Sequence, residues 1–318
     1  MAPAGSVVCF GGAAVDRGYR LAAAAVTGTS NPATARLDHG GVARNVAETL
    51  ARLGTRCSLV TALGDDAAGR DLRAGLAALG VDTAGSIVVA GAATAEYVAV
   101  TSPDGDLVLG VAAMAVLDRL DAALVASSAR LAGAGLVFAD CNADAGALAA
   151  LIGRASPFRL AVDAVSTAKA QRLPGDLAGV DVLFLNGDEA AAMLAAPPPP
   201  DDAAAVWAAG ALVARGARAV VLTQGAAGAV VAEAGRAFRV PAAPARVADV
   251  TGAGDALVAG TLARLAAGAP LDAAVRFGSA LAALTLEAAA SVRRDLPDGA
   301  LAAAAERRSA TMPPNRPL

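Results

Sequence analysis

Residues 249–260 read DVTGAGDALVAG, and this stretch predicts a tight turn that leads into a helix. Gly252, Gly254 and the small Ala253 between them let the backbone turn sharply, and the run 256–267 has helical composition and ends before Gly268 and Pro270. The free amide groups of residues 252–255 are therefore expected at a helix N-terminus, which binds anions. A carboxylate beside such an anion is costly unless it accepts a proton, so the natural role of Asp255 is that of a general base.

A plainer interpretation of the same stretch is that Asp255 only complements the helix dipole while the glycines form a turn. Two better-known phosphate loops do not fit. The chain has no GxxxxGK[ST] loop, and GAGDAL lacks the third glycine of a dinucleotide fingerprint. Motifs elsewhere in the sequence are needed to choose between a structural turn and a catalytic loop.

Short apolar runs alternate with helical patterns along most of the chain. This alternation predicts a mainly parallel sheet covered by helices on both faces, with ligands at the carboxyl ends of the strands. The predicted strands are 7–12, 57–63, 136–140, 159–163, 182–186 and 219–223, each followed by helical sequence, and the clearest helices are 44–54 and 66–80.

Two segments interrupt the alternation. Residues 17–40 are polar and loop-like, whereas residues 86–112 are predicted to form three successive strands with a PDG turn at 103–105. Together they are expected to form a small β-sheet appended to the main body.

Composition limits the classes of function. The net charge of −3 and the isoelectric point of 5.3 give no basic surface for nucleic acid. Three scattered cysteines match no metal motif and favour a reducing, cytoplasmic compartment. The chain shows no signal peptide and no apolar run of about 18 residues, so we expect no membrane association.

Four motifs in order resemble the ribokinase-like (PfkB) sugar and nucleoside kinases. They are GGVARNVAETLARLG (40–54), LNGDEA (185–190), TQGAAG (223–228) and the D-x-T-G-A-G-D that opens this section. The resemblance covers nearly the whole chain. It implies one kinase domain over residues 1–318, a three-layer α/β/α fold with a mainly parallel central sheet, and a small β-sheet lid formed by about 17–40 and 86–112.

The resemblance also implies roles for individual residues. Asp255 matches the catalytic base, in an anion hole made by Gly252, Ala253 and Gly254. Residues that match the ATP and phosphate site are Asn186, Glu189, Thr223, Gly225 and Gly228. Glu189 would reach Mg²⁺ through water, and a monovalent cation, expected to be K⁺, would be held by Asp249 and the carbonyl of Val250. The sugar hydroxyls of the substrate would be gripped by Asp16, Gly40, Gly41 and Asn45.

A narrower resemblance connects the chain with the pseudouridine kinases of this family. It rests on TSNPA (29–33), which adds Ser30 and Asn31 to the substrate residues, and on FADCN (138–142) and VDAVSTAK (162–169). Lys169, the only lysine, matches a lysine of that pattern; it either helps to fix the nucleotide side or is a surface residue.

The chain departs from the pseudouridine-kinase pattern at two places. Ala14 replaces an asparagine, and 113–115 reads AMA where the pattern has D-M-N. Because a site that has lost polar side chains discriminates less strongly between nucleobases, another nucleoside is an alternative acceptor.

The expected activity is transfer of the γ-phosphoryl group of ATP to the 5′-hydroxyl of a nucleoside, with pseudouridine as the first choice. Another kinase of the family, acting on inosine, adenosine or a free sugar such as ribose, is the first alternative. A nucleoside-binding sensor without catalysis is the second. The resemblance further implies a homodimer, since lids of this family often pair between subunits.

Overall fold

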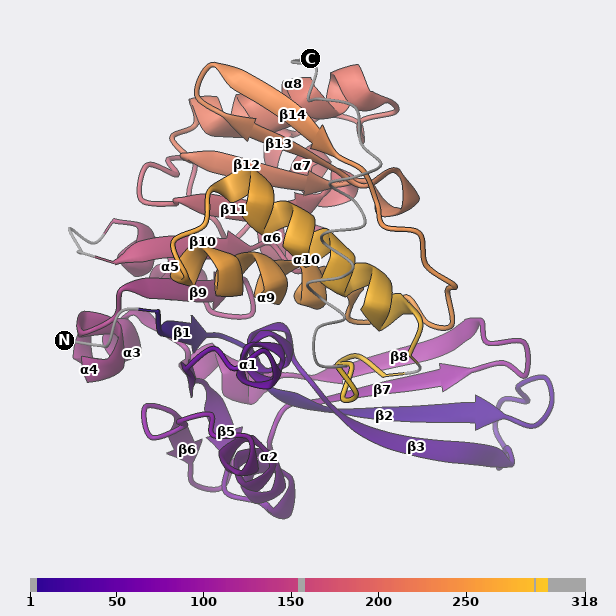
Figure 1. Ribbon diagram of the computed structural model, residues 1–318. Helices are drawn as coiled ribbons and strands as arrows, with labels where there is room; N and C mark the ends of the chain where they lie inside the picture. Colours follow the sequence, from indigo (N-terminus) through magenta and orange to yellow (C-terminus); the bar gives the residue numbers. More distant parts are fainter. Residues whose placement is uncertain (1–4, 154–157, 289, 297–318) are drawn as a thin grey trace.

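A computed structural model describes residues 5–153, 158–288 and 290–296. An eight-stranded sheet forms the centre of the molecule (Figure 1), in the order β14-β13-β12-β11-β10-β9-β1-β4. Six of its strands run parallel: β1 (Val7–Phe10), β4 (Cys57–Val60), β9 (Leu136–Asp140), β10 (Arg159–Asp163), β11 (Val182–Asn186) and β12 (Ala219–Thr223).

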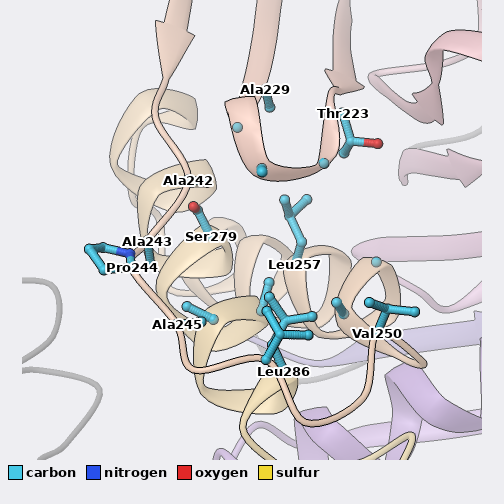
Figure 2. A pocket seen from close by; sticks show the side chains of 18 residues that line it. Thr223, Ala229, Ala242, Ala243, Pro244, Ala245, Val250, Leu257, Ser279 and Leu286 are labelled. Carbon is cyan, nitrogen blue, oxygen red and sulfur yellow. The ribbon is translucent and has the colours of Figure 1, made fainter.

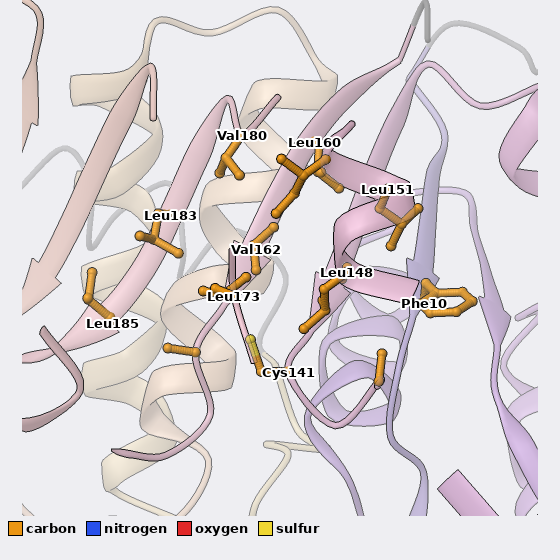
Figure 3. Close-up of a cluster of buried hydrophobic side chains, with 14 of the residues drawn as sticks. Phe10, Cys141, Leu148, Leu151, Leu160, Val162, Leu173, Val180, Leu183 and Leu185 are labelled. Atoms are coloured by element: carbon orange, nitrogen blue, oxygen red, sulfur yellow. The ribbon is translucent and has the colours of Figure 1, made fainter. Parts of the chain in front are cut away.

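Alternate residues of these strands enter two separate cores, because successive side chains of a strand point to opposite faces. On one face, Phe10, Val162 and Leu183 pack with Leu148 and Leu151 of α5 (Ala145–Ile152), as Figure 3 shows. On the other face, β-strand residues pack against the helices nearest the two ends of the chain. This double cover confirms the predicted three-layer α/β/α fold.

Each layer of helices contributes buried side chains to one of the two cores. The first core receives α3 (Ala122–Ser127), α4 (Ala129–Ala132), α5 (Ala145–Ile152), α6 (Thr167–Ala170), α7 (Gly187–Leu194) and α8 (Asp202–Ala214). The second receives α1 (Val42–Arg52), α2 (Ala67–Ala78), α9 (Ala253–Ala266) and α10 (Leu271–Leu286). Within the described residues, no helix is long and apolar enough to cross a membrane.

The second sheet confirms the small β-sheet expected from residues 17–40 and 86–112, and it corrects the loop-like description of 17–40. They are not loop-like: most of them form the long antiparallel strands β2 (Ala14–Leu21) and β3 (Ala33–Gly40). With β7 (Glu96–Thr101) and β8 (Leu107–Ala113) these strands make a four-stranded sheet, in the order β3-β2-β7-β8, that projects from the body (Figure 1). Residues 17–40 looked loop-like in the sequence because half-exposed strands carry polar residues and lack a continuous apolar run.

Two further strand predictions were wrong in detail. The run 86–91 contributes β6 (Ile87–Val89), which pairs with β5 (Ala62–Gly64) and not with the four-stranded sheet. The strand predicted over 57–63 is therefore split into β4 and β5. After β12 comes a short 3₁₀ turn (Gly225–Ala227), then the antiparallel hairpin of β13 (Ala229–Glu233) and β14 (Arg236–Val240), where helical sequence was expected.

Candidate active site

The carboxyl ends of four neighbouring parallel strands carry polar residues. Asp140 ends β9 and Asp163 ends β10, and the two are direct partners in the ladder. Asn186 ends β11 and pairs with Thr223 at the end of β12. The central strands thus deliver four polar side chains to one edge of the sheet, as the strand pattern predicted.

Asp140 is fully buried and organises the start of α1. Its carboxylate accepts hydrogen bonds from the amides of Gly12 (3.0 and 3.1 Å), Ala43 (2.7 Å) and Asn142 (2.9 Å). The Ala43 amide belongs to the first turn of α1, where a negative charge is favourable. Burial raises the pKa of Asp140, and the surrounding amides oppose that rise. A carboxylate distant in sequence therefore caps the helix that carries the N-terminal motif.

Gly41 supplies the turn into α1. Its φ of 93° lies in the left-handed region, and a Cβ there would collide with the carbonyl of Gly12. A side chain at Gly40 would collide with the carboxylate of Asp16 on β2. The two glycines thus bring Asp16 next to the start of α1, and these predicted substrate residues lie together.

Asn45 joins this N-terminal group to the opening loop. Its Nδ2 donates to Oδ2 of Asp255 at 2.6 Å, and its Oδ1 accepts from the guanidinium of the neighbouring Arg44. Arg44 and Asn45 are both buried. The predicted base is therefore held directly by a predicted substrate residue.

The half-buried Asp255 has a pKa raised to about 7. Burial is the largest cause, and the negative charges of Asp140 and Asp16 add to it; the hydrogen bond from Asn45 and the positive charge of Arg44 oppose it. A carboxylate whose pKa lies near neutral pH is well matched to accept a proton.

The turn before Asp255 has the geometry expected of an anion site. Gly252 caps α9 with a φ of 79°, and a Cβ there would collide with the carbonyl of Ser291. Among the described residues, no acceptor bonds the amides of Gly254 and Asp255. Ala253 donates only a long bond of 3.5 Å to the carbonyl of Val250. These amides are free to bind an anion at a helix start.

A cavity of about 630 Å³ opens beside this turn. Figure 2 shows that its wall comes from the end of β12, the segment after β14, and helices α9 and α10. The wall includes the predicted nucleotide residues Thr223, Gly225 and Gly228 together with Ala253 and Gly254. The remaining lining is almost entirely apolar, with the Ser279 hydroxyl as an exception.

Asn186 and Glu189 form a complete capping box at the start of α7. The Asn186 side chain accepts from the Glu189 amide (2.9 Å), and the carboxylate of Glu189 accepts from Asn186 N (2.8 Å) and Nδ2 (3.0 Å). Glu189 is buried, and burial raises its pKa. The helix-cap interpretation is therefore present in the structure, and any role toward Mg²⁺ would be additional to it.

Lys169 is not a free surface residue. Its Nζ donates to Oδ1 of the buried Asn142, and burial lowers its pKa. Asn142 is also the residue whose amide binds Asp140, so Lys169 reaches the polar edge of the sheet through one neighbour. Close by, Val165 has a φ of 66°, a left-handed conformation that is rare for a β-branched residue and concentrates at functional sites.

Two predicted substrate residues, Ser30 and Asn31, lie apart from this group, whereas the two predicted cation residues precede the turn at Gly252 and Val250 lines the cavity. Ser30 and Asn31 are in the loop at the far end of the β2–β3 hairpin, beyond Leu21, which is about 17 Å along the strand from Asp16. The Asn31 side chain bonds its own loop at Val26 and Thr29. Asp249 accepts from the Thr251 amide at 2.9 Å, and Val250 is exposed.

The sequence analysis missed three residues of the site. Asp140 and Asp163 stand at the ends of two predicted strands, a signal that was available, and Arg44 lies inside a motif that was quoted without a role for it. Burial raises the pKa of Asp163 well above its usual value, and the neighbouring charges of Asp255 and Glu189 raise it further.

The pfkB family of carbohydrate kinases matches the chain over residues 4–297, and the chain belongs to this family. It is thus related to sugar and nucleoside kinases. Pseudouridine kinase of Escherichia coli K12 is 28% identical over 259 residues, which cover 81% of this chain and 82% of that protein. A nucleoside kinase of Methanothermobacter thermautotrophicus is 30% identical over 252 residues, 78% of each chain.

Other relatives agree on the fold. A solved carbohydrate kinase from Agrobacterium tumefaciens is 28% identical, with a TM-score of 0.81 over 98% of this chain and 99% of that chain. Ribokinase from Thermotoga maritima has a TM-score of 0.82 at 19% identity, over 94% and 99% of the two chains. An uncharacterized E. coli sugar kinase, YeiI, is 35% identical over 155 residues, which span only 43% of that protein.

Proposed function

We propose that this chain is a single kinase domain that transfers the γ-phosphoryl group of ATP to the 5′-hydroxyl of a nucleoside, with pseudouridine as the preferred acceptor. The observation that carries the proposal is the contact between Asn45 and Asp255. It joins the predicted substrate residues to a carboxylate whose pKa is about 7 and whose neighbour Gly254 lines the cavity proposed for the nucleotide.

In the proposed reaction, Asp255 accepts the hydroxyl proton of the acceptor as its oxygen attacks the phosphoryl group. General-base catalysis of this kind contributes about 10²–10⁴ in rate. The amides at the start of α9, made accessible by Gly252, Ala253 and Gly254, stabilise the charge on the phosphoryl oxygens. The adenine and ribose of ATP occupy the cavity along β12 and α10, and Lys169 supports the phosphate side.

Mg²⁺ fits the charge distribution of this site. The charges of Asp255, Glu189 and Asp140 raise the pKa of Asp163, and Asp140 also raises that of Asp255, so acidic groups crowd the strand ends and a divalent cation would offset their charge. Within the described ranges, no cluster of three or more acidic, histidine or cysteine side chains could hold a metal directly. Both features suit an ion held mainly by phosphates and water, with Glu189 binding through water. Mg²⁺ would neutralise charge on the phosphate oxygens.

A monovalent cation, K⁺, is proposed for the loop before α9, held by Asp249 and the carbonyl of Val250. The loop is anchored to the end of α10, where the amides of Ala248 and Asp249 donate to the carbonyl of Leu286. An ion there would fix the turn that leads to Gly252 and the anion site.

The four-stranded sheet is proposed to act as a lid over the acceptor and to pair between subunits in a homodimer. Asp16 lies at the end of this sheet that meets the body, beside Gly40. The sheet also exposes apolar side chains on one strand, namely Leu107, Leu109 and Val111. Large exposed apolar patches mark interaction sites. The three cysteines are buried and free, which fits a cytoplasmic enzyme.

A second acceptor class is favoured by the two departures from the pseudouridine-kinase pattern. Ala14 pairs with Gly40, while Ala113 pairs with Glu96, the strand partner of Val15. Both alanines therefore lie at the same end of the small sheet as Asp16. Loss of polar side chains there would weaken discrimination between bases, so inosine, adenosine or ribose could replace pseudouridine.

A coupled assay of ADP release tests the proposal with ATP and Mg²⁺ and a panel of pseudouridine, uridine, inosine, adenosine and ribose. We expect the largest kcat/KM with pseudouridine. Activity with another acceptor and none with pseudouridine would overturn the substrate assignment while leaving the kinase assignment in place. If none of the acceptors in the panel led to ADP release, a nucleoside-binding protein without catalysis would be favoured.

A further inference from the structure

The buried Arg44 binds four different groups around the start of α1. Its guanidinium donates to the carbonyls of Gly40 (Nε, 3.1 Å) and His39 (2.6 Å), to the carboxylate of Glu48, and to Oδ1 of Asn45. His39 and Gly40 are the last residues of β3, so this one side chain contacts the small sheet, α1 and the residue that holds Asp255.

The amide of Asn45 stands between a group that can only donate and a group that can only accept. A guanidinium has no acceptor and an ionised carboxylate has no donor. The amide therefore satisfies both neighbours in one orientation, with Oδ1 toward Arg44 and Nδ2 toward Asp255 Oδ2. If the amide turned over, oxygen would face carboxylate and NH₂ would face guanidinium.

We propose that Arg44 is a positioning residue for the base: it orients the Asn45 amide so that this amide donates to Oδ2 of Asp255 and leaves Oδ1 to the acceptor hydroxyl. This inference rests on the proposed function for its catalytic meaning, but not for its geometry. Because the same guanidinium binds the carbonyls at the end of β3, one side chain contacts both the small sheet and the residue that donates to the base.

The electrostatic surroundings of Asp255 make the effect measurable. Groups from four elements act on it: Arg44 and Asn45 of α1 favour its ionised form, and Asp16 of β2, Asp140 of β9 and Asp163 of β10 oppose it. Loss of the hydrogen bond from the Asn45 side-chain amide removes a contribution that lowers the pKa of Asp255. The carboxylate should then hold its proton to higher pH.

Arg44→Lys separates orientation from charge. Lysine keeps the positive charge but has no planar fork to reach Asn45 and both carbonyls together. Arg44→Met removes both contributions. Neither variant leaves Glu48 without a charged partner, because Arg52 also binds its carboxylate at 2.7 and 3.0 Å.

The test is an NMR titration of the whole protein labelled with ¹³C at the aspartate carboxyl carbons, with Asp255→Asn to assign the signal. We expect the midpoint of Asp255 to rise by about half a pH unit in Arg44→Lys and by about one unit in Arg44→Met. An unchanged midpoint in Arg44→Lys would overturn the proposal, whether or not the wild-type protein shows kinase activity.

Arg52→Gln is the matched control, because Arg52 shares Glu48 with Arg44 but its hydrogen bonds go to Glu48 and the carbonyl of Arg294, with none to Asn45. Its midpoint should equal that of wild type. A shift as large as that of Arg44→Lys would mean that the Glu48 contacts, not the amide, control Asp255, and would also overturn the proposal. With an active acceptor, kcat/KM of Arg44→Met below pH 6.5 should fall about tenfold further than at pH 8.5.

Discussion

The two sides of the proposed site are built from different chemistry. The acceptor side, assembled from β2, α1, β9 and the start of α9, holds buried charged groups joined by short hydrogen bonds. The cavity on the donor side is lined by small apolar residues and two hydroxyl side chains. Charge is therefore concentrated where we propose the proton transfer, whereas the side proposed for the nucleotide offers mainly apolar surface and backbone groups.

Asp255→Asn should break the acceptor side with the largest effect. Removing the base is expected to lower kcat by about 10²–10⁴ while ATP binding stays nearly unchanged, because the residue lies outside the lining of the cavity. Steady-state kinetics and calorimetric titration with ATP would measure the two quantities. A variant that kept a tenth of wild-type turnover would exclude Asp255 as the base.

Gly252→Ala and Gly254→Ala form a matched pair at the boundary between the two sides. Alanine at 252 needs a positive φ and collides with the Ser291 carbonyl, so kcat should fall about 100-fold as the amides lose their alignment. A Cβ at 254 meets open space, and the loss there should stay below about tenfold. Equal losses in both variants would argue against a role for backbone alignment.

The pH dependence of kcat/KM should report the ionisation of Asp255 on the acceptor side. Since the pKa of Asp255 is about 7 and the base must be ionised, kcat/KM for the acceptor should fall about tenfold per pH unit below pH 7 and level off above it. A profile that is flat between pH 5.5 and 8 would contradict this assignment.

The same carboxylate should lower stability at high pH. Its folded pKa lies above the unfolded value near 3.8, so the folded state holds the proton more tightly, and this advantage is lost as the pH rises through about 7. Asp255→Asn should thus melt a few degrees above wild type at pH 8 and close to it at pH 4. Scanning calorimetry at both values would show whether the difference grows with pH.

Ser279→Ala should have the smallest effect, because the donor side does not depend on this side chain. The hydroxyl already bonds the carbonyl of Pro241 at 3.3 Å, so the KM for ATP should change less than about threefold. A tenfold rise would show that the hydroxyl reads the nucleotide directly, and the contrast between the two sides would be weaker than the structure indicates.

The four motifs, in one order and covering nearly the whole chain, predicted the family and the three-layer fold, and both are confirmed. The role of Asp255 as the base stays a prediction. Apolar runs of four to eight residues also located the buried parallel strands. The same reasoning missed the individual strands within residues 17–40, although it expected this segment to belong to the small β-sheet. Half-exposed strands of a projecting sheet carry polar side chains, and their pairing depends on partners elsewhere in the chain.

What only the tertiary structure decided is how distant residues act on one another. Asp140 caps α1 from 97 positions away, and Asn45 meets Asp255 across 210 positions. Neither contact follows from local spacing, since burial and neighbouring charge exist only once the strands have paired and the helices have packed. The sequence by itself predicted that DVTGAGDALVAG forms a turn into a helix, with the carboxylate of Asp255 in the first turn of that helix. Folding determined that this carboxylate has a pKa near neutral pH and that Asn45, which Arg44 contacts, donates a hydrogen bond to it.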